Sequence, residues 1–146
     1  MERTLIILKP DAVQRGLVGK IISRFERSGL KILDCYMDLL TPELANEHYD
    51  EHKGKDFYGG LIAFITSGPV LILALEGLGA IGKARMLMGS TTVPGSIRGD
   101  FCQYYTGHNL VHGSDSKESA KRELSLFFPK LQKSYTRVLD DVVFGM

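Results

Sequence analysis

Hydrophobic and polar residues alternate with two different periods along this chain, and these periods predict its strands and helices. Residues 4–9 form a short apolar strand, which stops where Pro10 prevents regular pairing. Apolar positions between residues 17 and 25 recur at helical spacing, and Gly29 ends that helix. In residues 33–39 apolar and polar side chains alternate, which predicts a strand with one buried and one wetter face.

The middle of the chain continues with helices around one buried strand. Thr41-Pro42-Glu43 has the N-cap, proline and acidic residue typical of a helix start, and this helix is predicted to reach about residue 52. Helical spacing returns in residues 57–65 and again in residues 80–87. Between them, residues 70–75 are apolar on both faces, which predicts a central strand.

The last third of the chain predicts a long loop, a strand and a helix. Residues 89–107 are rich in Gly, Thr and Ser without clear periodicity, and Arg98-Gly99-Asp100 within them favours a functional loop. A short strand at residues 110–112 follows. Asp115-Ser116-Lys117-Glu118 then resembles a capping box ahead of a helix over residues 120–127.

These elements follow the order βαββαβ when the helices between the second and third strands are counted as one long connection. That order predicts an α+β ferredoxin-like sandwich, in which a four-stranded antiparallel sheet has helices on one face and further helices are added. No internal repeat or linker interrupts the pattern, so residues 1–146 are expected to form a single domain.

The composition is that of a folded, soluble protein. Of its 146 residues 44% are hydrophobic, and a net charge of +1 lacks the basic excess that suggests nucleic-acid binding. The apolar runs are too short to span a bilayer and the N-terminus lacks the shape of a signal peptide, so we expect a cytoplasmic protein without membrane contact. Cys35 lies in an apolar pattern and is predicted to be a buried thiol outside any disulfide framework.

The stretch Asn109-Leu110-Val111-His112-Gly113-Ser114-Asp115 is the strongest indication of chemistry. Two apolar residues lead into His112, and a glycine and two residues that favour helix starts follow it. This pattern places the imidazole at a strand end beside a helix N-terminus, whose N–H groups favour anions. The alternative, a histidine packed beside a turn, is the commoner setting for a lone histidine.

Five further polar residues lie in segments that the predicted fold can bring near His112: Lys9, Tyr49, Arg85, Arg98 and Glu123. Lys9 ends a strand of the same sheet, and Glu123 lies on the helix that begins beside the histidine. Each arginine taken singly is more simply a solvated surface charge, but Arg85 lies on the helix that leads to the glycine-rich loop and Arg98 lies inside that loop. Together these groups indicate a polyphosphate site with a nucleophile.

The motif around His112 resembles the active-site signature of nucleoside diphosphate kinases, and the likeness covers essentially the whole chain. Further segments match the family in order: residues 2–16, 22–26, 48–52, 66–70, 94–101 and 113–123. The resemblance implies transfer of the terminal phosphate of a nucleoside triphosphate such as ATP to a nucleoside diphosphate, by a ping-pong reaction through phosphohistidine. The chain departs from the family in a shorter segment between Arg85 and Arg98, and in His108, where an arginine is usual.

The resemblance also implies a role for each site residue. His112 is the nucleophile, Glu123 holds its other ring nitrogen, and Ser114 orients Glu123. The implied phosphate ligands are Lys9, Tyr49, Arg85, Thr91 and Arg98. The implied nucleoside contacts are Asn109 and Lys9 at the sugar, Phe57 stacked on the base, Leu61 lining that pocket, and Tyr105 or Thr106 as a second base contact. Mg²⁺ is implied as the ion that bridges the phosphates, with Asp115 contacting it through water, and broad base specificity is expected.

Two functions of other classes are considered from the same residues. His48 and His52 lie one helical turn apart, but no third ligand for a zinc site is evident. A non-catalytic nucleotide-binding or scaffold protein of this fold would be indicated by loss of His112, Lys9 or Glu123, and all three are present.

Two segments indicate self-association. The strand at residues 33–39 could pair edge to edge with its twin in a second copy. The tail, residues 134–146, is too apolar to lie free in water, and it has the length found in hexamer-forming members of the family. The sequence therefore predicts a homo-oligomer built from dimers, with a hexamer favoured.

Overall fold

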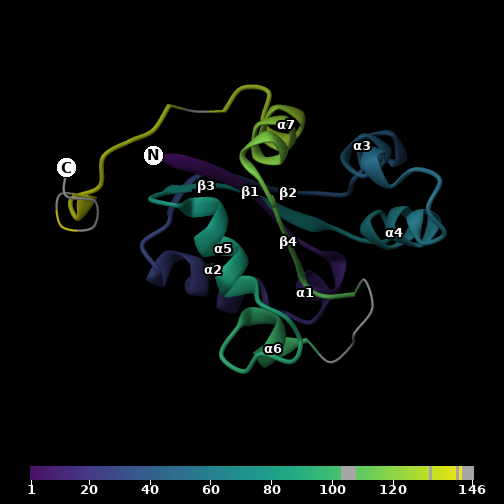
Figure 1. The fold of residues 1–146 in the computed structure, drawn as a ribbon, viewed down its shortest axis with the longest axis horizontal. Helices are drawn as coiled ribbons and strands as arrows, with labels where there is room; N and C mark the ends of the chain where they lie inside the picture. The colour runs from purple at the N-terminus through teal and green to yellow at the C-terminus, as the bar shows by residue number, and fades with distance from the viewer. Residues whose placement is uncertain (103–107, 132, 141, 143–146) are drawn as a thin grey trace.

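Four strands form one antiparallel sheet in the middle of the molecule (Figure 1). They are β1 (Glu2–Leu8), β2 (Lys31–Asp38), β3 (Val70–Gly77) and β4 (Val111–Gly113), and their order across the sheet is β2-β3-β1-β4. This order is that of the ferredoxin-like fold and confirms the predicted α+β class. The computed structural model describes residues 1–102, 108–131, 133–140 and 142.

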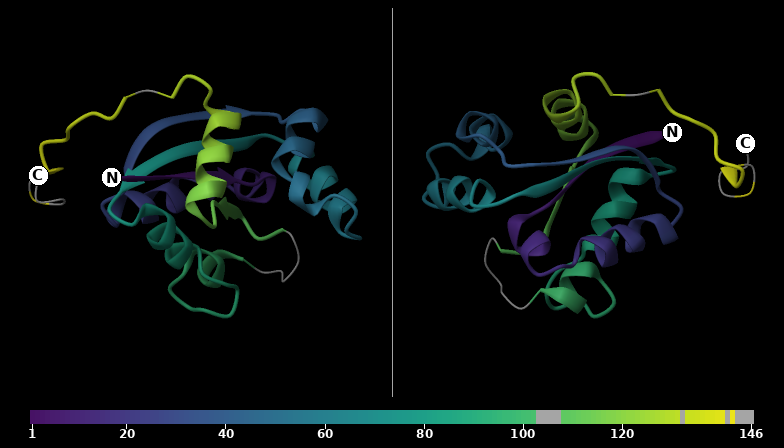
Figure 2. Two further views of the ribbon diagram at one scale, coloured as in Figure 1. Left: turned by 45° about the horizontal axis from the view of Figure 1, so that its top comes forward. Right: turned by 180° about the vertical axis from the view of Figure 1, so that it is seen from behind.

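Helices cover both faces of the sheet (Figure 2). One face carries the crossover helices α2 (Val18–Arg27) and α5 (Ala80–Met88), with the short α1 (Pro10–Gln14) and α6 (Ile97–Phe101) beside them. The added helices lie on the opposite face: α3 (Pro42–His48), the 3-10 helix η1 (Asp50–His52), α4 (Tyr58–Ile65) and α7 (Lys117–Phe127).

The two central strands are apolar on both faces because each face meets its own core. In β1, Leu5 and Ile7 pack against the α3, α4 and α7 side, while Ile6 and Leu8 pack against the α2 and α5 side. All four side chains are fully buried. Full burial of one such side chain stabilises the fold by about 1.5–3 kcal/mol. The unbroken apolar runs in the sequence therefore specify the centre of the sheet.

The edge strand β2 departs from the predicted alternation. Its pairing with β3 shifts between Ile32 and Asp34, which leaves Leu33 as the extra residue of a β-bulge. A shift of one residue exchanges the two faces of a strand, so Tyr36 joins the core beneath α7 and Cys35 is exposed. The prediction of a buried Cys35 thiol is wrong for this reason.

Other element bounds also differ from the sequence prediction. The helix expected to continue through η1 ends at His48, and η1 is a separate 3-10 turn. The predicted loop over residues 89–107 contains α6, which Ser96 caps. The last helix starts after Ser116, whose hydroxyl accepts a hydrogen bond from the Ser119 amide, so the N-cap lies one residue beyond Asp115.

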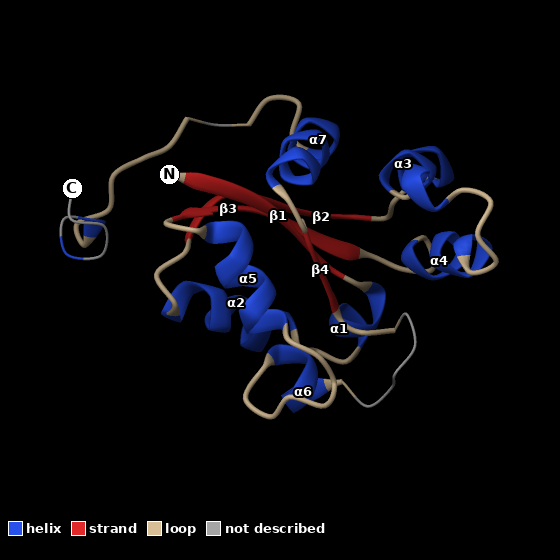
Figure 3. Cartoon of the chain, in the orientation of Figure 1, coloured by secondary structure: helices blue, strands red, loops and turns tan. Residues whose placement is uncertain are grey.

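The short strand β4 carries the candidate site (Figure 3). It pairs antiparallel with the end of β1, with Ile7 opposite His112 and Leu8 opposite Val111. Lys9, the next residue along, donates its backbone N–H to the Leu110 carbonyl at 2.8 Å. Among the described residues, none of the helices has the length and apolar character that a membrane span requires.

Candidate active site

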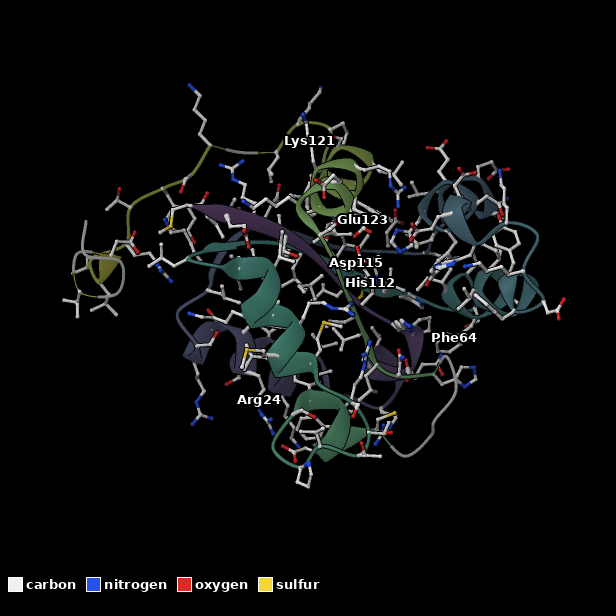
Figure 4. The ribbon with its side chains drawn as sticks, viewed as in Figure 1. Arg24, Phe64, His112, Asp115, Lys121 and Glu123 are labelled. Atoms are coloured by element: carbon white, nitrogen blue, oxygen red, sulfur yellow. The ribbon has the colours of Figure 1, made fainter. Side chains whose placement is uncertain are left out.

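A chain of hydrogen bonds fixes His112 from one side. Its Nε2 lies 2.8 Å from Oε1 of Glu123, and the Ser114 hydroxyl donates to the same oxygen at 2.9 Å. The backbone N–H of Leu5 donates in turn to the Ser114 hydroxyl at 3.2 Å. Figure 4 shows His112 and Glu123 together where β4 leads into α7. A carboxylate at Nε2 keeps the proton on that nitrogen, so Nδ1 presents the lone pair.

The segment before β4 is held in an unusual backbone conformation. Leu110 has a φ of 73°, in the left-handed region that costs a non-glycine residue about 1–3 kcal/mol. Its N–H donates to Oδ2 of Asp11 at 3.1 Å, and its carbonyl accepts from Lys9. The bend turns Asn109 toward the site, where its Oδ1 accepts from the Lys9 ammonium at 2.7 Å.

Lys9 is buried although it carries a charged group. It is 7% exposed, and this burial, aided by the positive charge of Arg98, lowers its pKa to about 8. Asp11 acts in the opposite direction. An anion that enters the site would favour the protonated form of Lys9 and raise its pKa again.

Two guanidinium groups flank β4. Arg98, on α6, donates to the carbonyls of Gly89, Asn109 and Val111 at 3.2, 3.3 and 2.7 Å. Arg85, on α5, donates to the carbonyl of Gly113 at 3.2 Å. Burial, with the nearby charge of Arg85, lowers the pKa of Arg98. The two arginines therefore lie beside the strand that carries His112, and each donates to backbone carbonyls there.

The segment from α3 to α4, which we call the aromatic arm, lies on the α7 side and carries Tyr49 and Phe57. Tyr49 follows α3 and is 8% exposed, and burial, with the charge of Glu123, raises its pKa to about 12. Phe57 precedes α4 and is 52% exposed, although it is a large apolar ring, and Leu61 lies half-buried on α4. Arg122 of α7 holds the aromatic arm against α7. Its guanidinium donates to the carbonyls of Glu47 and His48, at the end of α3, at 3.1 and 3.2 Å.

The remaining predicted residues are less closely joined to His112. Thr91 is half-buried beyond α5, and within the described part of the chain its side chain has no hydrogen bond. Asp115 is exposed, and a hydrogen bond with the Ser119 side chain holds its pKa below the usual value. The second base contact, Tyr105 or Thr106, falls outside the described residues.

His48 is a neighbour of His112 that the sequence did not predict. The two rings meet edge to face, with centroids 4.7 Å apart. His48 is 3% exposed, and burial, with the charge of a protonated His112, lowers its pKa well below the usual value. Its predicted partner His52 instead contacts Phe57 and Lys55. The sequence singled out His48 only through its spacing from His52 and its position next to Tyr49, and neither pointed to His112.

Comparisons with known proteins agree with this geometry. The family model described as "Nucleoside diphosphate kinase" matches residues 2–132. The nucleoside diphosphate kinase of Nocardia farcinica is 55% identical over 134 residues, which are 88% of this chain and 96% of that protein. That of Carboxydothermus hydrogenoformans is 50% identical over an alignment of 149 residues that covers 99% of each. The solved structure of a halophilic nucleoside diphosphate kinase from Halobacterium salinarum in complex with CDP superimposes with a TM-score of 0.91, at 44% identity and 98% coverage of both chains. This chain therefore belongs to the nucleoside diphosphate kinase family.

Proposed function

We propose that this member of the family transfers the terminal phosphate of ATP, or of another nucleoside triphosphate, to a nucleoside diphosphate by way of His112. In the first step Nδ1 attacks the terminal phosphorus, and the bond from phosphorus to the oxygen of the departing diphosphate breaks. In the second step a terminal oxygen of a new diphosphate attacks the phosphohistidine, and the N–P bond breaks. The hydrogen-bond chain from Ser114 through Glu123 to Nε2 carries this proposal, because it selects the attacking nitrogen.

The charged residues around β4 suit the electrostatic part of this reaction. Phosphoryl transfer depends mainly on alignment and on neutralising the phosphate oxygens. With a pKa of about 8, Lys9 is mostly protonated at neutral pH, and a bound phosphate holds the proton more firmly. Arg85 and Arg98 keep donors beyond those that bind carbonyls, since a guanidinium has about five N–H groups. Thr91 is assigned as a further phosphate ligand.

Tyr49 complements these cations with a neutral donor. Its pKa of about 12 keeps the phenol protonated throughout the physiological range, so the hydroxyl is a hydrogen-bond donor. Its burial and its interaction with Glu123 place it on the α7 side of the site. We assign it, with Lys9, to the phosphoryl group in transfer.

The nucleoside is assigned to the arm formed by α3 and α4. The exposed ring of Phe57 offers a stacking surface for the base, and Leu61 lines the same side. Lys9 and Asn109, joined by their 2.7 Å hydrogen bond, present polar groups to the sugar. A stacked ring accepts any base, so this arrangement supports broad base specificity.

Mg²⁺ is proposed as the ion that accompanies the phosphates. Asp115 offers an exposed carboxylate whose pKa lies below the usual value because of the Ser119 side chain, so it is an ionised oxygen donor. Mg²⁺ prefers oxygen ligands and keeps several waters when it binds with substrate phosphates, which fits a water-mediated contact with Asp115. When bound, the ion supplies further neutralisation of phosphate charge.

A homo-oligomer built from dimers, most simply a hexamer, is part of the proposal. The edge strand β2 and its extension expose Met37 by 53% and Leu39 by 57%. In the tail, Val138 is 97% exposed and Leu139 63% exposed, while Val143 and Phe144 fall outside the described residues. Apolar side chains this exposed favour burial against a second copy. The cytoplasmic location stays a prediction.

The decisive test is phosphoenzyme formation with labelled ATP. The wild-type chain should form an acid-labile, alkali-stable phosphoprotein that phosphorylates an added nucleoside diphosphate. His112→Asn should lose the label and turnover while folding and nucleotide binding persist. His108→Asn makes the same change at an exposed histidine and should keep the label. A wild-type protein that binds nucleotide without becoming labelled would support the non-catalytic scaffold instead.

A further inference from the structure

Three potential metal ligands converge at the catalytic histidine from three different elements. His48 ends α3, His112 lies on β4 and Glu123 lies on α7. One nitrogen of each histidine and one oxygen of the glutamate all lie within 4.8 Å of one another. Among the described residues, this is the cluster of histidine, cysteine and acidic side chains compact enough to hold an ion.

His48 gives this cluster its particular character. The side chain is almost completely buried, yet both of its ring nitrogens lack a hydrogen-bond partner in the described part of the chain. Buried polar atoms are normally paired, so an imidazole without any partner calls for an explanation. Tyr49, Phe127 and His112 contact its ring through their own rings, and none of these contacts is a hydrogen bond to a His48 nitrogen.

The ligand set selects one class of metal. Two imidazole nitrogens and one carboxylate oxygen, with a fourth position open, form a zinc set of the His₂Glu kind. At Zn–N distances of about 2.0–2.1 Å, tetrahedral ligands lie about 3.3 Å apart, so side-chain rotations would have to draw the cluster together. Mg²⁺ prefers oxygen ligands in an octahedron and does not suit this set.

We propose that His48, His112 and Glu123 form an inhibitory site for Zn²⁺ and similar borderline divalent metals. The ion would enter from the solvent side, where the His112 side chain keeps 22% of its exposure, and would replace the hydrogen bond between His112 and Glu123. An ion at Nε2 would leave the ring proton on Nδ1, so the attacking nitrogen would lose its lone pair, and Glu123 would be released from its orienting role. Lys9 and Arg122 oppose a cation here and limit its affinity, while Glu123 offsets one charge.

Metal binding itself is independent of the proposed function, while its inhibitory effect rests on that function. The first test therefore uses no nucleotide. Co²⁺ is titrated into the full-length, tag-free protein, and visible absorption is recorded because tetrahedral Co²⁺ absorbs far more strongly than hydrated Co²⁺. We expect one bound Co²⁺ per chain, displaced by Zn²⁺ and removed by a chelator.

Variants separate this site from other ligands. His48→Gln and His48→Phe should each weaken Co²⁺ binding at least tenfold, and the second keeps an aromatic ring against His112. His52→Gln removes a nearby, more exposed histidine and should bind Co²⁺ as the wild type does. Circular dichroism identifies any His48 variant that misfolds. Equal Co²⁺ binding by a folded His48→Phe variant would overturn the proposal, and so would an absorption spectrum typical of octahedral Co²⁺.

The second test measures phosphoenzyme formation in the presence of Zn²⁺. Inhibition should be reversed by a chelator, and it should need at least ten times more Zn²⁺ in a folded, active His48 variant than in the wild type. Inhibition that is unchanged in that variant would contradict the proposal. If the wild type forms no phosphoenzyme, the proposed kinase function fails, while the Co²⁺ titration still decides the metal site.

Discussion

Ser114→Ala is the substitution that best separates the structural and catalytic parts of this site. The Ser114 hydroxyl is fully buried, accepts a hydrogen bond from the Leu5 amide and donates one to Glu123. Losing the acceptor leaves a buried backbone N–H unpaired, at a cost of about 1–3 kcal/mol. Losing the donor to the carboxylate costs about 1.5–3 kcal/mol. Since both bonds belong to one group and do not add fully, we expect the free energy of unfolding to fall by about 2–4 kcal/mol.

The same substitution should slow the chemistry more than it changes nucleotide binding. Without the Ser114 hydroxyl, the described residues that still hold the Glu123 carboxylate are His112 and a more distant Arg122, 3.8 Å from its other oxygen. Loss of an outer hydrogen bond that orients a metal-binding histidine costs about 10–100-fold in activity, and we expect the same range for the bond that orients Glu123. The rate of phosphoenzyme formation should fall by this amount, while nucleotide affinity changes little.

The measurements are urea unfolding and rapid-quench phosphorylation, both at one fixed protein concentration because an oligomer's stability depends on it. Ser125→Ala is the matched control, since Ser125 is exposed on the same helix and should change stability by less than about 0.5 kcal/mol. Unchanged stability would show that the two hydrogen bonds contribute little. A wild-type phosphorylation rate in a destabilised variant would refute the orienting role of Ser114.

Three further outcomes are expected. The kcat/KM for nucleotides should fall as pH rises through about 8, because the folded chain loses the Lys9 proton there and not at the ordinary 10.5; Lys9→Met should lack this limb. Between about pH 8 and pH 10.5 the unfolded chain keeps the Lys9 proton that the folded chain has lost. The contribution of Lys9 to folding stability therefore rises with pH over this range, which urea unfolding at several pH values checks. Phe57→Ala should raise KM by about 5–150-fold for purine and pyrimidine diphosphates alike, because stacking contributes about 1–3 kcal/mol per base, and a loss confined to one base class would contradict the stacking role. Light scattering at micromolar concentration should give a hexamer; a stable dimer or tetramer would exclude only the hexamer, and a monomer would exclude the whole assembly proposal.

The sequence predicts the fold correctly for the strands that are buried on both faces, because only one arrangement covers them. The apolar runs in β1 and β3 require cover on both faces, and the order of elements then fixes the antiparallel arrangement. The sequence prediction fails in β2, because an alternating pattern over residues 33–39 does not fix which set of side chains faces the core. The bulge at Leu33 decides between them, and it depends on pairing with β3 and on the packing of Tyr36 beneath α7. Such long-range packing leaves no local signal.

In the candidate site too, local sequence predicts some residues and long-range packing places the others. The strand end and helix start around His112 are local features, so the proximity of Ser114 and Glu123 could be predicted. His48 arrives on an inserted helix, and its contact with His112 depends on how α3 docks against α7 through Arg122. The left-handed backbone at Leu110 was also beyond prediction, since it is held by a carboxylate that lies far away in the sequence.

The brevity of β4 explains why so many charged groups gather on its backbone. A three-residue strand has few ladder hydrogen bonds, and Arg98 adds bonds to the carbonyls of Asn109 and Val111 while Arg85 adds one to Gly113. These are the groups assigned to the phosphates. The two arginines that would attract the substrate therefore also fix the strand that carries the nucleophile. The distance between the arginines and His112 is set before any nucleotide binds. Such preorganisation is what phosphoryl transfer requires, because its transition state is stabilised by charges that need not move.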